Sequence, residues 1–293
     1  MGGGGDVVGA LATAHLAETL GVRAVLGGTT WERRVIDPLP GPRRLDEIDG
    51  AEPLSAHVAL AGPDTTGPGG FAFAESRLAG VLGERTVLVD PTGGPEALAR
   101  EIAEALPRLH CDAVALVDVG GDALAHGDEA GLASPLCDAI LLAAGAALAA
   151  GGTPTVLGIV GAGCDGELTP AEVLDRVGEV AAGGGALGAW GITPEAGARI
   201  EAAVAAVPTE ASAAALRCAR GERGRLEIRG GRRTVQLTTA GGLTFYLDPA
   251  VAVGTAARLA RAVAGARGLD EAQERLAALG VRTELDLERD PAS

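Results

Sequence analysis

The chain has 293 residues, of which 47% are hydrophobic, so it can bury a full core without support from disulfides or a metal. Its 39 acidic residues against 24 basic ones give a net charge of −15, which repels nucleic acid and anionic membranes. The basic residues are all arginine, and the absence of lysine excludes a Walker-type phosphate lysine, a Schiff-base lysine and lysine acid/base chemistry.

The cysteines and the hydropathy pattern favour a cytoplasmic protein. The four cysteines are widely spaced without a C-x-x-C pair, which is typical of reduced, buried thiols and does not favour a zinc site. No apolar run approaches the roughly 20 residues of a membrane span, and no signal peptide opens the chain. The Ala-, Gly- and Arg-rich composition is of a bacterial type. We therefore expect no membrane or nucleic-acid partner, while the chain could form a homo-oligomer.

Apolar β-branched runs alternate with Ala/Leu-rich helical stretches from the start to about residue 163. Helices are predicted at 7–20, 95–106 and 134–150, and strands at 22–28, 57–62, 85–90, 113–121 and 154–163. Fully apolar strands separated by helices indicate a parallel sheet covered on both faces. The fold class is therefore α/β, a Rossmann-like three-layer fold with a mainly parallel sheet.

The residue pattern in the rest of the chain changes near residue 220. Thr169, Thr193 and Thr209 are predicted helix caps, the first in a capping box with Glu172. From 221 onward, β-rich runs separated by Gly-Gly pairs predict a C-terminal antiparallel hairpin region and then two closing helices. We thus expect a ligand-binding α/β core at 1–220 and a β-hairpin plus helical subdomain at 221–293 packed on it.

The glycine-rich loop at residues 2–5 resembles that of a βα unit, but the strand that should feed it is missing. Gly3, Gly4 and Gly5 could present backbone N–H groups and a helix N-terminus to a phosphate or carboxylate. The alternative is a structural turn in which Asp6 caps the following helix. Both interpretations stay open, and we include Asp6 among the predicted binding residues.

The second candidate segment, 31–44, is a proline-stiffened loop rich in arginine. We predict that it forms a positive pocket for a carboxylate or phosphate, because arginine binds such groups in a bidentate manner and tryptophan can stack on a ligand. The alternative is a surface loop whose arginines pair with acids at 46–49. The predicted binding residues are Trp31, Glu32, Arg33, Arg34 and Arg43, with Arg44 as a further member of the cluster.

The third candidate segment follows the predicted strand at 113–121 and is rich in acids. Asp118 and Asp122 flank Gly120 and Gly121, which would let a ligand approach the backbone, so both acids are predicted acid/base groups or Mg²⁺ ligands. His126 is the third predicted catalytic residue, oriented by a neighbouring carboxylate. Asp165 follows the next strand and joins the predicted binding residues, because ligands bind where the carboxyl ends of parallel strands meet.

Several segments together resemble the family known as DUF1152. They are GGGGDVVGAL, WERRVIDPLPGPRR, VDVGGDALAHGDEAGLASPLCDA, EIRGGRRTVQLT and TFYLDP. The resemblance spans nearly the whole chain and implies a single α/β protein with a shared site in these segments, without supplying a reaction. A weaker likeness is to nucleoside hydrolases, in which a glycine-bearing loop and an Asp begin the chain and carboxylates hold a divalent cation. In this chain the loop contains only Asp6 and has no second acidic residue beside it, so the likeness remains an analogy of fold.

Three functions remain open from the sequence. The leading expectation is an enzyme that acts on a small anionic metabolite, nucleotide- or amino-acid-derived, by acid/base chemistry of the hydrolase, lyase or cyclase type. The second is a non-catalytic nucleotide-binding or regulatory protein. The third is a divalent-metal enzyme similar to nucleoside hydrolases. Mg²⁺ and a nucleotide are the cofactors that the residues would suit.

Overall fold

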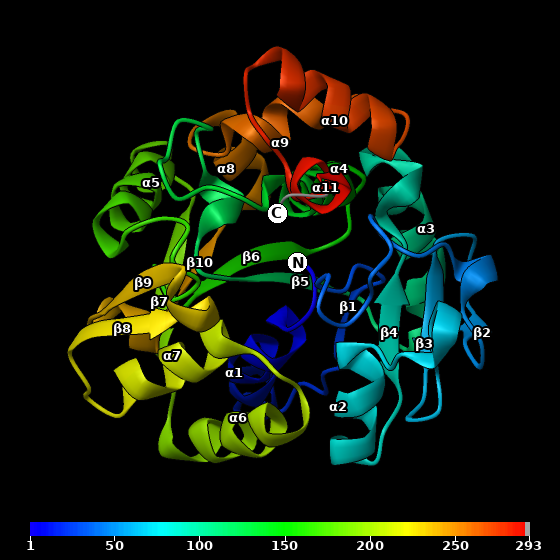
Figure 1. The fold of residues 1–293 in the computed structure, drawn as a ribbon, viewed down its shortest axis with the longest axis horizontal. Coiled ribbons are helices and arrows are strands. Elements are labelled where there is room, and N and C mark those ends of the chain that lie inside the picture. The colour runs from blue at the N-terminus through cyan, green and yellow to red at the C-terminus, as the bar shows by residue number, and fades with distance from the viewer. Residues whose placement is uncertain (291–293) are drawn as a thin grey trace.

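The strands of the protein form three small sheets rather than one. A computed structural model describes residues 1–290 as a mixed α/β fold with eleven α-helices (Figure 1). Sheet order is β1-β4-β3-β2 in the first sheet, β5-β6-β10-β7 in the second and β8-β9 in the third. The bounds are β1 (Gly27–Thr29), β2 (Glu52–Pro53), β3 (Val58–Ala61), β4 (Thr86–Val89), β5 (Val114–Val119), β6 (Thr155–Val160), β7 (Ala186–Gly191), β8 (Gly224–Ile228), β9 (Arg233–Leu237) and β10 (Leu243–Leu247).

Helices cover both faces of the second sheet. On one face, the apolar helix α4 packs against β5 and β6, with α8 and α9 beside it; on the other face lies α1 (Figure 1). Because α4 is buried around most of its circumference, its sequence is apolar almost throughout. The bounds are α1 (Asp6–Thr19), α2 (Ala74–Leu82), α3 (Pro95–Leu109), α4 (Pro135–Ala150), α5 (Pro170–Ala182), α6 (Pro194–Ala206), α7 (Glu210–Ala219), α8 (Pro249–Gly254), α9 (Arg258–Val263), α10 (Leu269–Ala278) and α11 (Glu284–Arg289).

The prediction of a mainly parallel sheet is wrong. Only β1–β4 and β5–β6 pair in parallel among the described strands, and the other strand pairs are antiparallel. In the second sheet β10 lies between β6 and β7 and runs against both. The residue pattern of 243–247 does not indicate whether this strand pairs in parallel or antiparallel orientation, or which strands it pairs with.

The predicted C-terminal hairpin is present as β8 and β9, which pair in antiparallel register from Gly224–Leu237 to Ile228–Arg233. The sequence reading of 221–293 as a subdomain did not anticipate that β10 inserts into the sheet of the core. The capping box at Thr169 is confirmed, since its hydroxyl accepts from the N–H of Glu172 while the Glu172 carboxylate accepts from Thr169. Within residues 1–290, no helix combines the length and apolar character needed to cross a membrane.

The first residues of the chain lie between the first and second sheets. Residues 1–5 form no strand, and α1 begins at Asp6, one residue before the predicted start at Val7. The Met1 ammonium donates to the carbonyl of Val117 in β5, and the Thr29 hydroxyl in β1 donates to the Gly2 carbonyl, 3.2 Å away. β1 and β5 are not paired with each other, so these contacts help to join the two sheets beside the glycine loop.

Candidate functional site

A cleft of about 910 Å³ opens above the glycine loop, where segments from across the chain converge. It is lined by residues of the glycine loop, the arginine loop after β1, the segments after β5 and β6, the N-terminal turns of α4 and α7, the β8–β9 turn and α11. Acids and arginines dominate this lining. The site therefore forms only when N-terminal, central and C-terminal segments of the chain pack together.

The glycine loop is shaped by close backbone contacts. A Cβ atom on Gly3 would overlap the Trp31 carbonyl oxygen, and Gly4 has φ +65°, a conformation that favours glycine. Gly5 precedes α1 as its N-cap without a side-chain cap bond. Asp6 accepts from the Gly2 N–H at 2.9 Å, so its carboxylate holds the loop rather than capping the helix in the usual way.

Arginine side chains from two distant segments meet at the cleft. Arg33, from the loop after β1, and Arg229 and Arg233, from the β8–β9 hairpin, all line it. Burial, together with the nearby positive charges of Arg233 and Arg33, lowers the pKa of Arg229 below its usual value. Because like charges repel, such a cluster suits an anion placed among the three side chains.

The β8–β9 turn holds Arg229 in an uncommon conformation. Its φ is +56°, which is rare for a residue with a side chain and costs of order 1–3 kcal/mol. Its backbone N–H donates to both carboxylate oxygens of Glu210, each at 3.0 Å. This contact secures the turn over the cleft and compensates part of the strain.

Buried carboxyl groups lie in or next to the lining of the same cleft. Burial, followed by the charge of Asp6, raises the pKa of Asp118 to about 7. Burial and the charge of Asp118 raise the pKa of Asp138 well above its usual value. Burial and the charges of Asp138 and Glu167 do the same for Asp122. These groups are therefore poised to hold protons or to share a cation.

Two glutamates in the cleft bind backbone N–H groups. Glu167 accepts from Ala133 at 2.7 Å and Ser134 at 2.9 Å, and from the Arg233 guanidinium at 2.9 Å. Glu284, at the start of α11, accepts from the N–H groups of Leu136 and Cys137 in the first turn of α4, while burial raises its pKa to about 8. Both glutamates thus fix the position of α4.

The structure brings most of the predicted binding residues together. Those that line the cleft are Gly3, Gly4, Gly5, Asp6, Trp31, Glu32, Arg33, Arg34, Asp122 and Asp165. Asp118, which is only 1% exposed, Gly120 and Gly121 are not part of this lining. The Asp118 carboxylate clusters with those of Asp6 and Asp138, whereas the Asp122 carboxylate clusters with those of Asp165 and Glu167.

Other parts of the arginine loop have structural partners. Arg43 is buried, pairs with Asp37 at 2.8 Å and is not part of the cleft lining. Arg44 is exposed and pairs with Asp46, as in the alternative interpretation of a surface loop. The Trp31 indole N–H donates to Glu288 at 3.1 Å, which positions a buried ring in the cleft wall.

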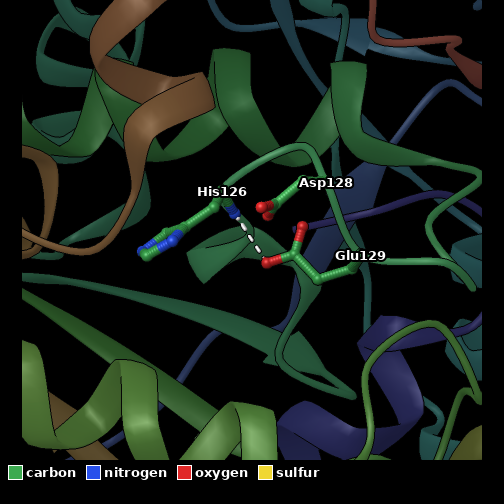
Figure 2. A group of neighbouring side chains, drawn as sticks. All are labelled: His126, Asp128 and Glu129. Atoms are coloured by element: carbon green, nitrogen blue, oxygen red, sulfur yellow. Dashed lines mark hydrogen bonds between the residues drawn. The ribbon is translucent and has the colours of Figure 1, made fainter.

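His126 does not lie in the cleft lining. Its backbone N–H donates to Glu129 at 2.8 Å, and one of its ring nitrogens lies within 4.8 Å of carboxylate oxygens of Asp128 and Glu129 (Figure 2). The ring nitrogen Nε2 lies 3.1 Å from Glu179 on α5. Among the described residues, the carboxylate at hydrogen-bonding distance from the ring is thus Glu179 rather than the predicted Asp122 or Asp128.

Several cleft residues were not among the predicted site residues. Asp138 lies in the first turn of an apolar helix, where its sequence surroundings indicate only a buried helical face. The arginines of the β8–β9 turn and Glu284 follow the predicted subdomain boundary, although the arginine segment carries the family resemblance. That resemblance was the available signal for them. The missed residues are Ser134, Cys137, Asp138, Glu167, Thr209, Glu210, Arg229, Arg232, Arg233, Glu284 and Glu288.

Gly120→Ala should destabilise the protein by about 3 kcal/mol, because the residue has φ +133° and a Cβ there would overlap the Asp165 carboxyl group. Gly178→Ala is the matched control, since Gly178 lies within α5 with open space around it and alanine should stabilise the helix by up to about 1 kcal/mol. Urea unfolding of both variants measures the difference. Equal stability of the two would contradict the tight approach of Asp165 to this turn.

The sequence comparisons agree with the resemblance carried by these segments. No curated protein and no solved structure matches the chain. The family model described as "Protein of unknown function (DUF1152)" matches residues 1–292, which include every cleft-lining segment. The glycine loop, the two arginine segments and the carboxyl groups of this candidate site all lie within the match, and the chain belongs to the DUF1152 family.

Proposed function

We propose that the protein is a cytoplasmic enzyme that acts on a small anionic metabolite, nucleotide- or amino-acid-derived, by acid/base chemistry of the hydrolase, lyase or cyclase type. The observation that supports this proposal is a single cleft in which an arginine cluster faces buried carboxyl groups. An arginine cluster binds an anion, and a carboxyl group with a raised pKa can exchange a proton near neutral pH.

The anion would bind between the glycine loop and the arginines. Arg33 donates to the Pro208 carbonyl through Nη2, while its buried Nε has no hydrogen-bond partner within residues 1–290. The Nε of Arg229 likewise makes no hydrogen bond, although it lies 3.8 Å from the Glu210 carboxylate. A buried N–H without an acceptor is costly unless a ligand accepts from it, which favours an anionic substrate for these two half-buried arginines.

Asp138 is our candidate for the group that exchanges a proton with the substrate. It is 3% exposed, lines the cleft, and its Oδ1 has no hydrogen-bond partner in the described part of the chain. Its Oδ2 lies 3.0 Å from the point where a Cβ on Gly2 would be, so the carboxyl group is adjacent to the glycine loop. A substrate bound by that loop would be within its reach.

A non-catalytic binding or regulatory protein is the second candidate function. Glu167 and Glu284 favour it, because both carboxylates are used to bind backbone N–H groups around α4 and so have a structural role. In such a protein the arginines would bind a nucleotide or another anion without turnover. The two functions differ in whether a bound ligand is consumed.

An incubation of the purified protein with a metabolite extract distinguishes them. Mass spectrometry should show that the wild type captures an anionic metabolite and depletes it. Asp138→Asn should capture the same metabolite without depleting it, since the amide cannot exchange a proton. Capture without depletion by the wild type would support the binding protein, and capture of only neutral or cationic compounds would contradict both anion-binding functions.

Arg229→Ala should weaken the binding of an anion at least about 10-fold, because a charge-assisted hydrogen bond contributes about 1.5–3 kcal/mol. Arg44→Ala is the control: it removes the same charge from a side chain that is 68% exposed and outside the cleft lining. Isothermal titration with adenosine monophosphate and with citrate measures both variants against the wild type. A loss of affinity in Arg44→Ala equal to that in Arg229→Ala would show only an effect of net charge.

A further inference from the structure

Three mostly buried carboxylates of the cleft lining lie close to one another. Asp122 follows β5, and Asp165 and Glu167 follow β6, so the parallel pairing of these two strands places the three residues at the same sheet edge. One oxygen from each lies within 4.8 Å of the others, and the residues are 7%, 6% and 4% exposed, respectively. Gathering three carboxylates away from water is unfavourable unless a positive charge or protons compensate them.

The described protein groups compensate this cluster only in part. Glu167 has the Arg233 guanidinium and two backbone N–H groups as partners. Both carboxylate oxygens of Asp165, by contrast, are buried and make no hydrogen bond of normal geometry within residues 1–290, although the backbone N–H of Glu167 acts on this carboxylate. A proton on Asp165 would still leave it without an acceptor, whereas a cation at the centre of the cluster would satisfy its oxygens directly.

We infer that Asp122, Asp165 and Glu167 bind a divalent cation of the Mg²⁺ or Mn²⁺ type. All three donors are carboxylate oxygens, the ligands that hard cations prefer, and no histidine or cysteine belongs to the group. All three residues also line the cleft, so water or a substrate can complete the coordination. Mg²⁺ usually keeps several water ligands and therefore needs few protein ligands, whereas Ca²⁺ takes six to eight oxygens.

Of the two predicted metal ligands, this assignment retains Asp122. Asp165 and Glu167 take the place of the other, Asp118. Asp118 belongs to the neighbouring group with Asp6 and Asp138, where the Met1 ammonium lies 3.5 Å from Asp6 and already supplies a positive charge. A third group contains His126, Asp128 and Glu129. Glu129 in this group accepts from two backbone N–H groups and from Arg176, and His126 Nε2 lies 3.1 Å from Glu179, so protein groups already serve as partners here.

A cation at this site would serve the proposed function in a specific way. It would lie on the same cleft as the arginine cluster and could polarise an oxygen of the anion or of a bound water. Only this catalytic role rests on the proposed function, because cation binding itself needs no substrate. The two can therefore fail separately.

Titration of EDTA-treated, full-length protein with MnCl₂ and MgCl₂ tests the site. Calorimetry and the electron paramagnetic resonance signal of free Mn²⁺ should both show one tight site per chain in the wild type. Asp165→Asn and Asp122→Asn should each lower the affinity at least about 10-fold, since even groups behind the ligands of a metal contribute 10–100-fold. Circular dichroism checks that both variants are folded.

Asp128→Asn is the matched control, because it makes the same change in an exposed residue of another acidic group and should leave Mn²⁺ affinity unchanged. Absence of binding by the wild type would overturn the proposal. So would unchanged affinity in Asp165→Asn, or a loss caused by Asp138→Asn alone, which would place the cation in the neighbouring group. Binding of Mn²⁺ by a protein that consumes no metabolite would contradict the proposed enzyme and leave the cation site intact.

Discussion

Asp118→Asn should make the protein more stable at pH 8 by about 4 kcal/mol when divalent cations are removed. Burial raises the pKa of Asp118 to about 7, against 3.8 for a solvated aspartate. About three pKa units correspond to about 4 kcal/mol, the free energy that favours the protonated form in the folded state. Asparagine has a similar shape and carries no charge, so it avoids the cost of a buried carboxylate.

The sign of this effect follows from proton release. Below about pH 4 the Asp118 carboxyl is protonated in both states and has no cost. As the pH rises from about 4 to 7 only the unfolded chain releases the proton, so stability falls; above about 7 the full cost is present. Urea unfolding in EDTA at pH 5 and pH 8 measures this slope, which Asp118→Asn should reduce.

Asp112→Asn is the control for that experiment, since Asp112 is exposed and its replacement should change stability by less than about 0.5 kcal/mol. An Asp118→Asn variant that is no more stable than the wild type at pH 8 would show that the folded protein stabilises the Asp118 carboxylate by other means.

Asp138→Asn should lower turnover of the substrate by about 10²–10⁴-fold, the range that a positioned acid or base contributes. KM should change little, because the arginines and the glycine loop that bind the anion remain. Initial rates with the metabolite found in the extract experiment measure both parameters. A variant whose KM rises while its kcat is preserved would make Asp138 a binding residue instead of a proton carrier.

The local sequence signals predicted which segments meet better than how the sheets are built. The runs before Asp118 and Asp165 are strands β5 and β6, and their parallel pairing brings Asp122 and Asp165 to one edge as expected. The antiparallel insertion of β10 was not predictable from its own residues, because strand direction is decided by partners far away in the sequence. Alternation and apolar character are the same for both directions.

The site residues likewise divide into those that local sequence signals indicate and those that only tertiary packing brings to the cleft. Arg33 was predictable because a positive segment follows a strand at the expected edge, whereas Arg43, ten residues further along the loop, pairs internally with Asp37. Asp138 was missed because helical periodicity shows that a face is buried and does not show that the face borders a cleft. Arg229 reaches the cleft only through the packing of the β8–β9 hairpin, which no local pattern encodes.

The absence of pairing between β1 and β5 has a consequence for cooperativity. The contacts of Met1 with the Val117 carbonyl and of Gly2 with the Thr29 hydroxyl join these two edges in place of a continuous ladder, so the edges should separate by local opening, seen as hydrogen exchange, before the chain unfolds globally. The cleft takes Arg33 from one side of this seam and Asp165 from the other. A ligand that contacts both would slow that opening and make the two halves unfold as one unit.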